Sequence, residues 1–194
     1  MKRFQSLAAV AALVFLTLGA SNVSATSVLP LDLDRITADA QDIVHVRCTG
    51  NTVQPDAAVG VVTVTTFTVL DRAKGPQTSA LTVRQPGGER DGIAIDYRVP
   101  KFEVGAEYVL FMPAPSRWGL ASPVGLSQGA FSVVHGRAGR EVGNGRDIAA
   151  LLSSNDRAAA TGSLAARLSM APSERSRMGL EDFMALVRAK AARK

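Results

Sequence analysis

The chain has 194 residues, of which 46% are hydrophobic and 20% are charged, and its formal net charge at pH 7 is +5. This charge is too small for the large positive field of a nucleic-acid-binding surface, and aromatic residues make up only 5% of the chain. Cys48 is the only cysteine, so an intramolecular disulfide is excluded. We therefore expect an ordinary hydrophobic core with Cys48 buried in it, no bound nucleic acid and no cofactor.

Residues 1–25 have the pattern of a secretory signal peptide. Two basic residues precede the apolar run LAAVAALVFLTLGA, and the sequence VSA, ending at Ala25, provides the small residues that a signal peptidase requires. The run is shorter than the about 20 residues that a transmembrane helix needs. We expect cleavage after Ala25, export to the periplasm or the extracellular space, and no membrane contact beyond the signal peptide.

Residues 26–145 are predicted to form an all-β domain. LDLDRITADAQ (31–41) predicts a short helix, and DIVHVRCTG (42–50) alternates apolar and polar residues as a half-buried strand does. Residues 71–75 are predicted to form a turn. Further predicted strands are 60–70, 80–86, 107–112 and 130–134, with weaker signals around 93–95, 118–120 and 140–142. Five or six strands with Gly and Pro turns favour a small OB-like or related β-barrel.

The sequence changes character after Gly145. Residues 146–178 are rich in Ala, Ser and Arg, and we expect a linker that is weakly helical or disordered. Residues 179–194 recover a helical pattern, with acidic residues in the first turn and basic residues in the last. The β-barrel is therefore expected to carry an amphipathic C-terminal helix.

The pentapeptide GLSQG (125–129) matches G-x-S-x-G, the nucleophile elbow of α/β-hydrolases, with Ser127 as the nucleophile. An elbow needs a strand before the serine and a helix after it, and then an acid and a histidine later in the chain. Here a strand pattern follows the serine, and no Asp or Glu lies between Ser127 and His135, the last histidine. The sequence favours a glycine-permitted turn and bulge, and no enzyme is predicted.

The histidines give no metal site, because neither His45 nor His135 has metal-ligand spacing to a partner. His45 falls on the polar side of its predicted strand, which we expect to face solvent, and His135 falls at a strand end. Cys48 lies three residues after His45, so the two side chains point to opposite faces of the strand. The PGG sequence at 86–88 lacks the Lys-Ser/Thr ending of a phosphate loop.

Four segments follow one another in a specific order: TTFTVLDRAKG (65–75), LTVRQPGG (81–88), VPKFEVGAEYVLF (99–111) and GLSQGAFSV (125–133). Through them the chain resembles a broad group of small exported bacterial proteins without a settled function. The shared pattern is K-G, P-G-G, V-P, F-x-x-G-x-x-Y-x-L-F and G-L-x-Q-G-x-F-x-V. The resemblance implies that Gln128 and the glycines, rather than Ser127, are the recurring part of GLSQG.

The F-x-x-G-x-x-Y-x-L-F element after a K-G turn is also similar to netrin-like and tissue-metalloproteinase-inhibitor domains, which implies an OB-fold. Those inhibitors reach the zinc of the protease with an N-terminal cysteine. The expected mature chain begins at Thr26 with no cysteine nearby, so the inhibitory chemistry is not carried over. The resemblance to the exported group also suggests secreted metalloproteases as neighbours.

The leading functional hypothesis is a non-enzymatic binding module that recognises another secreted or envelope protein, such as a protease. The expected contact rim combines the loops 86–92 and 125–129. Its candidate residues are Pro86, Gly87, Gly88, Gln128 and Gly129.

Two alternatives stay open. One is a hydrolase that uses carboxylates of the long loop, where Asp91, Asp96 and Glu103 are available. The other is a structural protein held at the membrane surface by the C-terminal helix.

Overall fold

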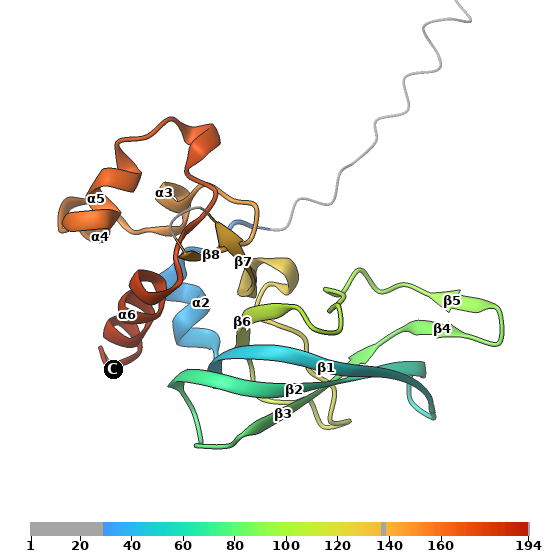
Figure 1. The fold of residues 1–194 in the computed structure, drawn as a ribbon. Coiled ribbons are helices and arrows are strands. Elements are labelled where there is room, and N and C mark those ends of the chain that lie inside the picture. The colour runs from blue at the N-terminus through green and yellow to red at the C-terminus, as the bar shows by residue number, and fades with distance from the viewer. Residues whose placement is uncertain (1–28, 137–138, 194) are drawn as a thin grey trace, which may run out of the picture.

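The computed structural model describes residues 29–136 and 139–193 and is rich in antiparallel β-structure (Figure 1). Helices gather around one end of the main sheet. The opposite end is a long ribbon of strands, above which a separate hairpin projects. The predicted signal peptide and its cleavage position at Ala25 lie outside the described residues.

Seven strands form the main sheet, in the order β3-β2-β1-β6-β7-β8-β9, and every neighbouring pair is antiparallel. They are β1 (Asp42–Asp56), β2 (Gly60–Lys74), β3 (Ala80–Pro86), β6 (Glu107–Met112), β7 (Ala130–Gly136), β8 (Gly139–Gly143) and β9 (Met178–Gly179). A separate hairpin pairs β4 (Gly88–Arg90) with β5 (Ile93–Ile95).

The β-rich character of the prediction is confirmed, but the sheet that the structure describes is open. β3 and β9 are its two edges and do not pair with each other. Helices pack against one face of the sheet at one of its ends. β9 has only two residues, which is too short to close a barrel against β3.

β1 and β2 are longer than predicted, because each is the other's pairing partner over 15 residues. β1 continues past Gly50, and β2 runs through the predicted turn at 71–75 as far as Lys74. Three register shifts interrupt their pairing, and bulges of this kind bend and twist a ribbon. The weak strand signal at 118–120 is wrong, since the chain turns there with a hydrogen bond from Gly119 N to Ser116 O.

β6 pairs with only the first part of β1, from Asp42 to Arg47. Cys48 then makes two backbone hydrogen bonds to the segment just before β6: its N–H donates to the Ala106 carbonyl, and its carbonyl accepts from Gly105 N. The pairing of β1 on this side ends there. Beyond Cys48, β1 pairs with β2 alone. The outer end of the β1–β2 ribbon therefore projects from the sheet, and other segments must cover its face.

The helices are short except for the last. They are α2 (Leu33–Asp39), η1 (Leu126–Gly129), α3 (Ile148–Leu151), α4 (Ser154–Ala158), α5 (Gly162–Leu168), η2 (Pro172–Glu174) and α6 (Leu180–Ala191). Asp32 caps α2 by accepting a hydrogen bond from Arg35 N at 2.7 Å. The helix predicted within 31–41 is confirmed in α2, and the C-terminal helix predicted within 179–194 is confirmed in α6.

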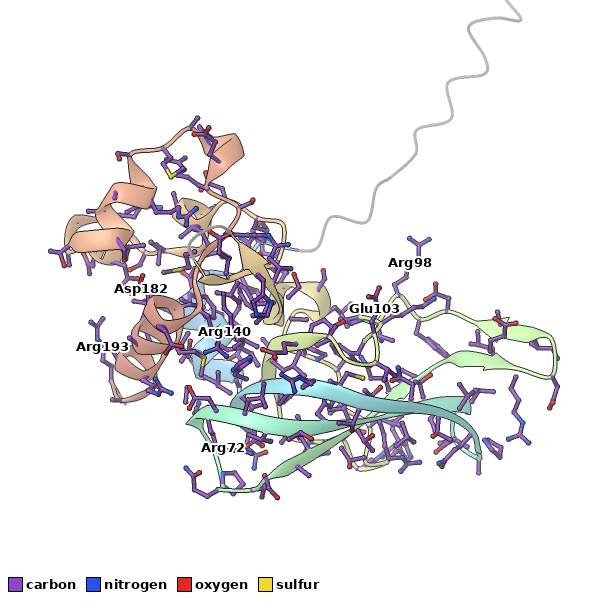
Figure 2. The ribbon with its side chains drawn as sticks, viewed as in Figure 1. Arg72, Arg98, Glu103, Arg140, Asp182 and Arg193 are labelled. Carbon is purple, nitrogen blue, oxygen red and sulfur yellow. The ribbon has the colours of Figure 1, made fainter. Side chains whose placement is uncertain are left out.

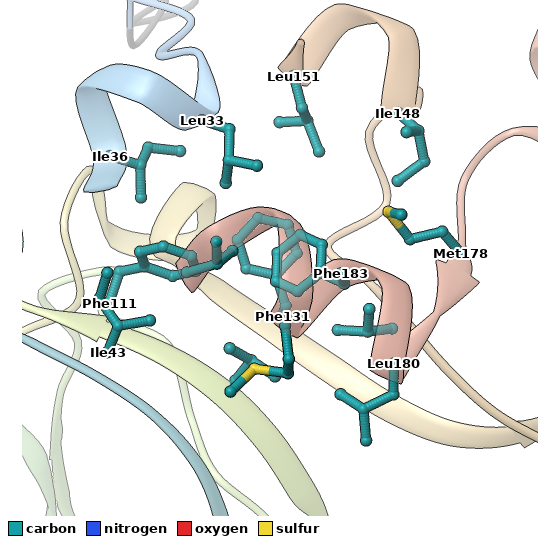
Figure 3. Close-up of a cluster of buried hydrophobic side chains, with 14 of the residues drawn as sticks. Leu33, Ile36, Ile43, Phe111, Phe131, Ile148, Leu151, Met178, Leu180 and Phe183 are labelled. Atoms are coloured by element: carbon teal, nitrogen blue, oxygen red, sulfur yellow. The ribbon is translucent and has the colours of Figure 1, made fainter. Parts of the chain in front are cut away.

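The larger core lies between one face of the sheet, α2 and α6 (Figure 3). Phe183 of α6 is 1% exposed and packs against Phe131 and Phe111, with ring centroids 4.9 and 6.3 Å away. The apolar face of α6 is therefore used inside the protein, and it is not free to lie on a membrane surface. Among the described residues no helix is long and apolar enough to cross a bilayer.

The segment 146–178 contains short helices, which was one of the two alternatives predicted. Ile148, Leu151 and Leu152 belong to the larger core and are at most 3% exposed. Arg175 reinforces this packing, because its Nη2 donates to Asp147 Oδ2 at 2.7 Å. The short apolar patch of these three residues is visible in the sequence and anchors the segment, whereas ion pairs such as Arg175–Asp147 are not evident from its Ala- and Ser-rich composition.

One buried ion network ties the C-terminal helix to the helices before it. Lys190 of α6 donates to Asp156 at 2.5 Å and to Asp34, and its side chain is only 2% exposed. Asp156 also accepts a 2.6 Å hydrogen bond from the Ser153 hydroxyl. Burial raises the pKa of Asp156, but the bonds from Lys190 and Ser153 outweigh it, so its pKa lies below the ordinary value.

We predict that Phe183→Ala lowers the free energy of unfolding by about 3–5 kcal/mol, because it leaves a cavity beside the rings of Phe111 and Phe131. The exposed Ala189 on the same helix is the control, and Ala189→Ser should change stability by less than about 0.5 kcal/mol. Urea denaturation of both variants measures this. A loss below about 1 kcal/mol for Phe183→Ala would be too small for the truncation of a buried aromatic side chain, and it would show that α6 is not part of the core.

We predict that Asp156→Asn lowers the free energy of unfolding at pH 7 by about 2–3 kcal/mol. Since the folded-state pKa of Asp156 lies below its unfolded value, its contribution is fully present above about pH 4 and is lost as pH falls through the folded-state pKa. Stability curves measured from neutral to acidic pH should be flatter in the variant. Asp39→Asn, which alters an exposed i,i+4 pair with Arg35, should keep the wild-type slope.

Candidate functional site

A cavity of about 410 Å³ lies on the projecting end of the β1–β2 ribbon, beneath the β4–β5 hairpin. Strand residues form its floor, and the chain from Pro86 to Phe102 forms its roof and walls. The lining residues are Asn51, Val53, Thr63, Thr65, Gln85, Pro86, Gly87, Gly88, Glu89, Ala94, Ile95, Asp96, Tyr97, Val99, Pro100, Lys101 and Phe102.

The floor is polar, and its side chains are fixed by bonds to one another. The Thr65 hydroxyl donates to Asn51 Oδ1 at 2.7 Å, and Asn51 Nδ2 donates to the Phe102 carbonyl at 2.7 Å. The Thr63 hydroxyl donates to the Gly87 carbonyl at 2.8 Å. These bonds also connect the floor to the walls, so the cavity is held in shape from below.

Two glycines let the chain leave β3 and cross the ribbon. Gly87 has φ 93°, and a Cβ there would lie 2.5 Å from the Ile95 carbonyl oxygen. Gly88 has φ 144°, and a Cβ there would lie 2.9 Å from a Val53 methyl. Only glycine meets both the backbone angle and the close approach at these positions. The predicted rim residues 86–88 therefore form one wall of the cavity.

The hairpin above the cavity was only partly predicted. Asp91 and Gly92 both have positive φ, 52° and 78°, as a two-residue type I′ turn requires. The Asp-Gly pair between Arg90 and Ile93 is a strong hairpin signal in the sequence. The polar residues Asn51 on β1 and Thr63 and Thr65 on β2, within strands rich in β-branched residues, were a second signal that did not enter the prediction.

Phe102 anchors the far wall by packing into a smaller second core. Its ring lies 5.2 Å from Phe67 and 5.1 Å from Tyr108, in edge-to-face geometry in both cases. The Tyr108 hydroxyl accepts a hydrogen bond from Glu103 N at 2.9 Å. Figure 2 shows Arg98 and Glu103 on this wall segment, with the Arg98 side chain pointing away from the sheet.

Gln128 and Gly129 do not lie with the other predicted rim residues. Gln128 is 9% exposed and binds the N-terminal segment, accepting from Leu31 N at 2.8 Å and donating to the Leu29 carbonyl at 3.1 Å. Arg146 also donates to Gln128 Oε1, at 3.0 Å. A Cβ at Gly129 would lie 2.5 Å from the Val124 carbonyl. The structure therefore gives this part of GLSQG a packing role, away from the cavity.

The segment around Ser127 is the 3-10 helix η1, not the predicted bulge and not a nucleophile elbow. Gly125 and Leu126 both have left-handed backbone angles, with φ 60° and 59°, and η1 leads directly into β7. The Ser127 side chain lies on the exposed side of this turn, and His135 is exposed at the far end of β7. The strand-serine-helix order that positions a nucleophile in α/β-hydrolases is not formed here.

The three carboxylates of the hydrolase alternative do not meet in the cavity. Asp96 is part of its lining, whereas Asp91 and Glu103 are not. Asp91 lies at the hairpin tip and pairs with Arg90, with 84% of its side chain exposed. Glu89 is the second carboxylate in the lining. In the described parts of the chain, no three His, Cys, Asp or Glu side chains are grouped as metal ligands would be.

The expected solvent exposure of His45 is wrong, because the residue is only 3% exposed. Its Nε2 lies 2.9 Å from Glu107 Oε2, and Arg47 donates to the other Glu107 oxygen at 2.6 Å. Burial raises the pKa of Glu107, but the hydrogen bonds from Arg47 and His45 outweigh it and lower the pKa below the ordinary value. The sequence could not show that β6 brings this acid beside His45.

Cys48 is buried as predicted, with 1% of its surface exposed. Its side chain belongs to the second core, and burial raises the pKa of the thiol, so the thiol form is favoured. A reactive cysteine needs a lowered thiol pKa and an accessible thiolate, and Cys48 has the opposite properties.

Comparison with known proteins finds no match, either among protein-family models or among curated proteins.

We predict that Gln128→Ala lowers the free energy of unfolding by about 2 kcal/mol, because it leaves Leu31 N and Arg146 without their shared acceptor. The neighbouring variant Ser127→Ala should be neutral within about 0.5 kcal/mol. Thermal and urea unfolding measure both. A larger effect of Ser127→Ala than of Gln128→Ala would overturn the packing role of Gln128.

Proposed function

We propose that this chain is an exported, non-enzymatic binding module, and that the cavity beneath β4–β5 contacts another secreted or envelope protein, such as a protease. The observation that supports this most is the chemistry of the cavity. Its walls are largely apolar, the polar side chains of its floor are neutral hydroxyls and amides, and its three charged lining residues, Glu89, Asp96 and Lys101, are exposed. Among the described residues that line it there is no histidine, cysteine or serine to act as a nucleophile or base.

The surroundings of the cavity favour a protein over a small metabolite as the ligand. Ile93 on the hairpin is 66% exposed, Tyr97 is 49% exposed, and Val104 beyond Phe102 is 63% exposed. Large apolar side chains gathered around a concave site are a feature of protein-binding surfaces. A partner that covers them would remove their apolar area from water while one of its side chains enters the cavity.

The resemblance to small exported proteins and to OB-like inhibitor domains stays a prediction. It supports the proposal in one respect: the P-G-G element of the pattern supplies the glycines that build the cavity wall. Export is proposed on the signal-peptide pattern alone.

The test is affinity capture from the native envelope and culture supernatant with two matched variants. Ala94→Trp places a large ring in the lining of the cavity, and Ala166→Trp places the same ring on an exposed position of α5 at the other end of the molecule. We predict that a specific partner is retained by wild type and by Ala166→Trp and is lost with Ala94→Trp. Circular dichroism confirms that both variants are folded.

If the partner is a protease, its activity with and without the bound module decides between inhibition and stabilisation. A partner that binds Ala94→Trp as well as wild type would overturn the assignment of the site. Folded bait that captures no partner would count against the binding function itself.

A further inference from the structure

The cavity floor presents one hydrogen-bond acceptor and one donor to a ligand. Thr63 uses its hydroxyl proton for the Gly87 carbonyl, so its oxygen is left as an acceptor. Asn51 accepts from Thr65 and gives one N–H to the Phe102 carbonyl, which leaves its second amide N–H as a donor.

One small group can reach both sites. Asn51 pairs with Thr65 across the ribbon and Val53 pairs with Thr63, so Asn51 and Thr63 are diagonal neighbours on one face. Diagonal cross-strand side chains are close enough for long side chains to interact. A ligand group bound between them must accept from Asn51 and donate to Thr63. A hydroxyl does both, whereas an ammonium only donates and a carboxylate only accepts.

The charges of the cavity also exclude an ionic ligand group at the floor. Its charged lining residues, Glu89, Asp96 and Lys101, are all exposed at the rim. Lys101, the cationic residue of the lining, is exposed and is not among the hydrogen-bonded floor residues, so the floor offers a carboxylate or phosphate neutral partners and no paired cation. The lining instead offers apolar surface, from Val53 at the floor and from Ile95 and the Phe102 ring in the walls.

We propose that the cavity binds a tyrosine side chain of the partner protein, with its ring between the apolar walls and its hydroxyl between Asn51 and Thr63. This inference rests on the proposed binding function and specifies the recognition element. Tyrosine combines a rigid apolar ring with a hydroxyl that both donates and accepts, which is the combination that the walls and floor require. A tyrosine in a pocket ringed by exposed apolar residues is a typical binding hot spot.

Three small probes of one shape test the chemistry: 4-methylphenol, toluene and 4-methylbenzoate. Each is titrated into the ¹⁵N-labelled protein, and the shifts of the cavity amides are followed by NMR. We expect 4-methylphenol to bind about fivefold more tightly than toluene, the effect of about one net hydrogen bond, and 4-methylbenzoate to leave the cavity amides unchanged. Equal binding of 4-methylphenol and toluene, tighter binding of 4-methylbenzoate, or no response to any probe would overturn the proposal.

A pair of variants separates recognition from structure. Thr63→Val removes the acceptor at nearly constant volume but also removes the bond to the Gly87 carbonyl, so toluene affinity is the measure of any change in cavity shape. Thr68→Val makes the same change at an exposed position of the same strand. We expect Thr63→Val to reduce the affinity for 4-methylphenol to that for toluene while toluene binding is unchanged, and Thr68→Val to affect neither. A purely structural loss would weaken both probes equally and would overturn the role given to Thr63.

The two proposals fail in distinguishable ways. A captured partner that is lost with Ala94→Trp, together with no preference for 4-methylphenol, would keep the binding function and reject tyrosine recognition. If the preference is found, substitution of the partner's contacting tyrosines by phenylalanine should weaken the complex, and an unchanged complex would contradict the inference.

Discussion

The difference in length between β1 and β6, which pair side by side in the sheet, shapes the rest of the molecule. β6 supports only the first six residues of β1, and the backbone bonds at Cys48 end that ladder. The remainder of β1 pairs with β2 alone, so the outer edge of β1 is unpaired, whereas β2 is also paired with β3 from Val62 to Thr68. The segment 86–102 covers one face incompletely, and the space that it leaves is the cavity.

The two cores support different parts of the molecule. The larger one unites α2, α6 and one face of the sheet, and its connections are long-range: Lys190 reaches Asp34, and Gln128 holds the N-terminal segment. The smaller one contains Cys48 and Phe67 and ends at Phe102. Because Phe102 belongs to this core and also to the cavity wall, the position of the wall depends on packing around a rigid aromatic group.

Local patterns in the sequence were sufficient for most of the secondary structure. The alternation in 42–50 and the β-branched run from Gly60 predicted β1 and β2, and the charge pattern of 180–190 predicted α6. Contacts between residues far apart in the sequence were not predictable. His45 looked exposed because its cover comes from β6 and from α6, whose Arg188 pairs with Asp71 opposite His45 on β2.

The same limit applies to the candidate site. The glycines at 86–88 were identified as rim residues from their motif, and they do line the cavity. Gln128 was grouped with them for the same reason, but its amide is satisfied by Leu29 and Leu31, about a hundred positions earlier in the chain. A recurring motif does not distinguish a binding residue from a packing residue. Asn51 and Thr63 belong to no motif and were recognised only once the ribbon and its cover were in place.

The most direct test of the central claim is hydrogen–deuterium exchange of the protein with and without its captured partner. If the cavity is the contact site, the amides of 86–102, together with those of the ribbon beneath them, will exchange more slowly in the complex, while α3–α5 will be unchanged. Protection confined to the helical end, with 86–102 exchanging as in the free protein, would contradict the account.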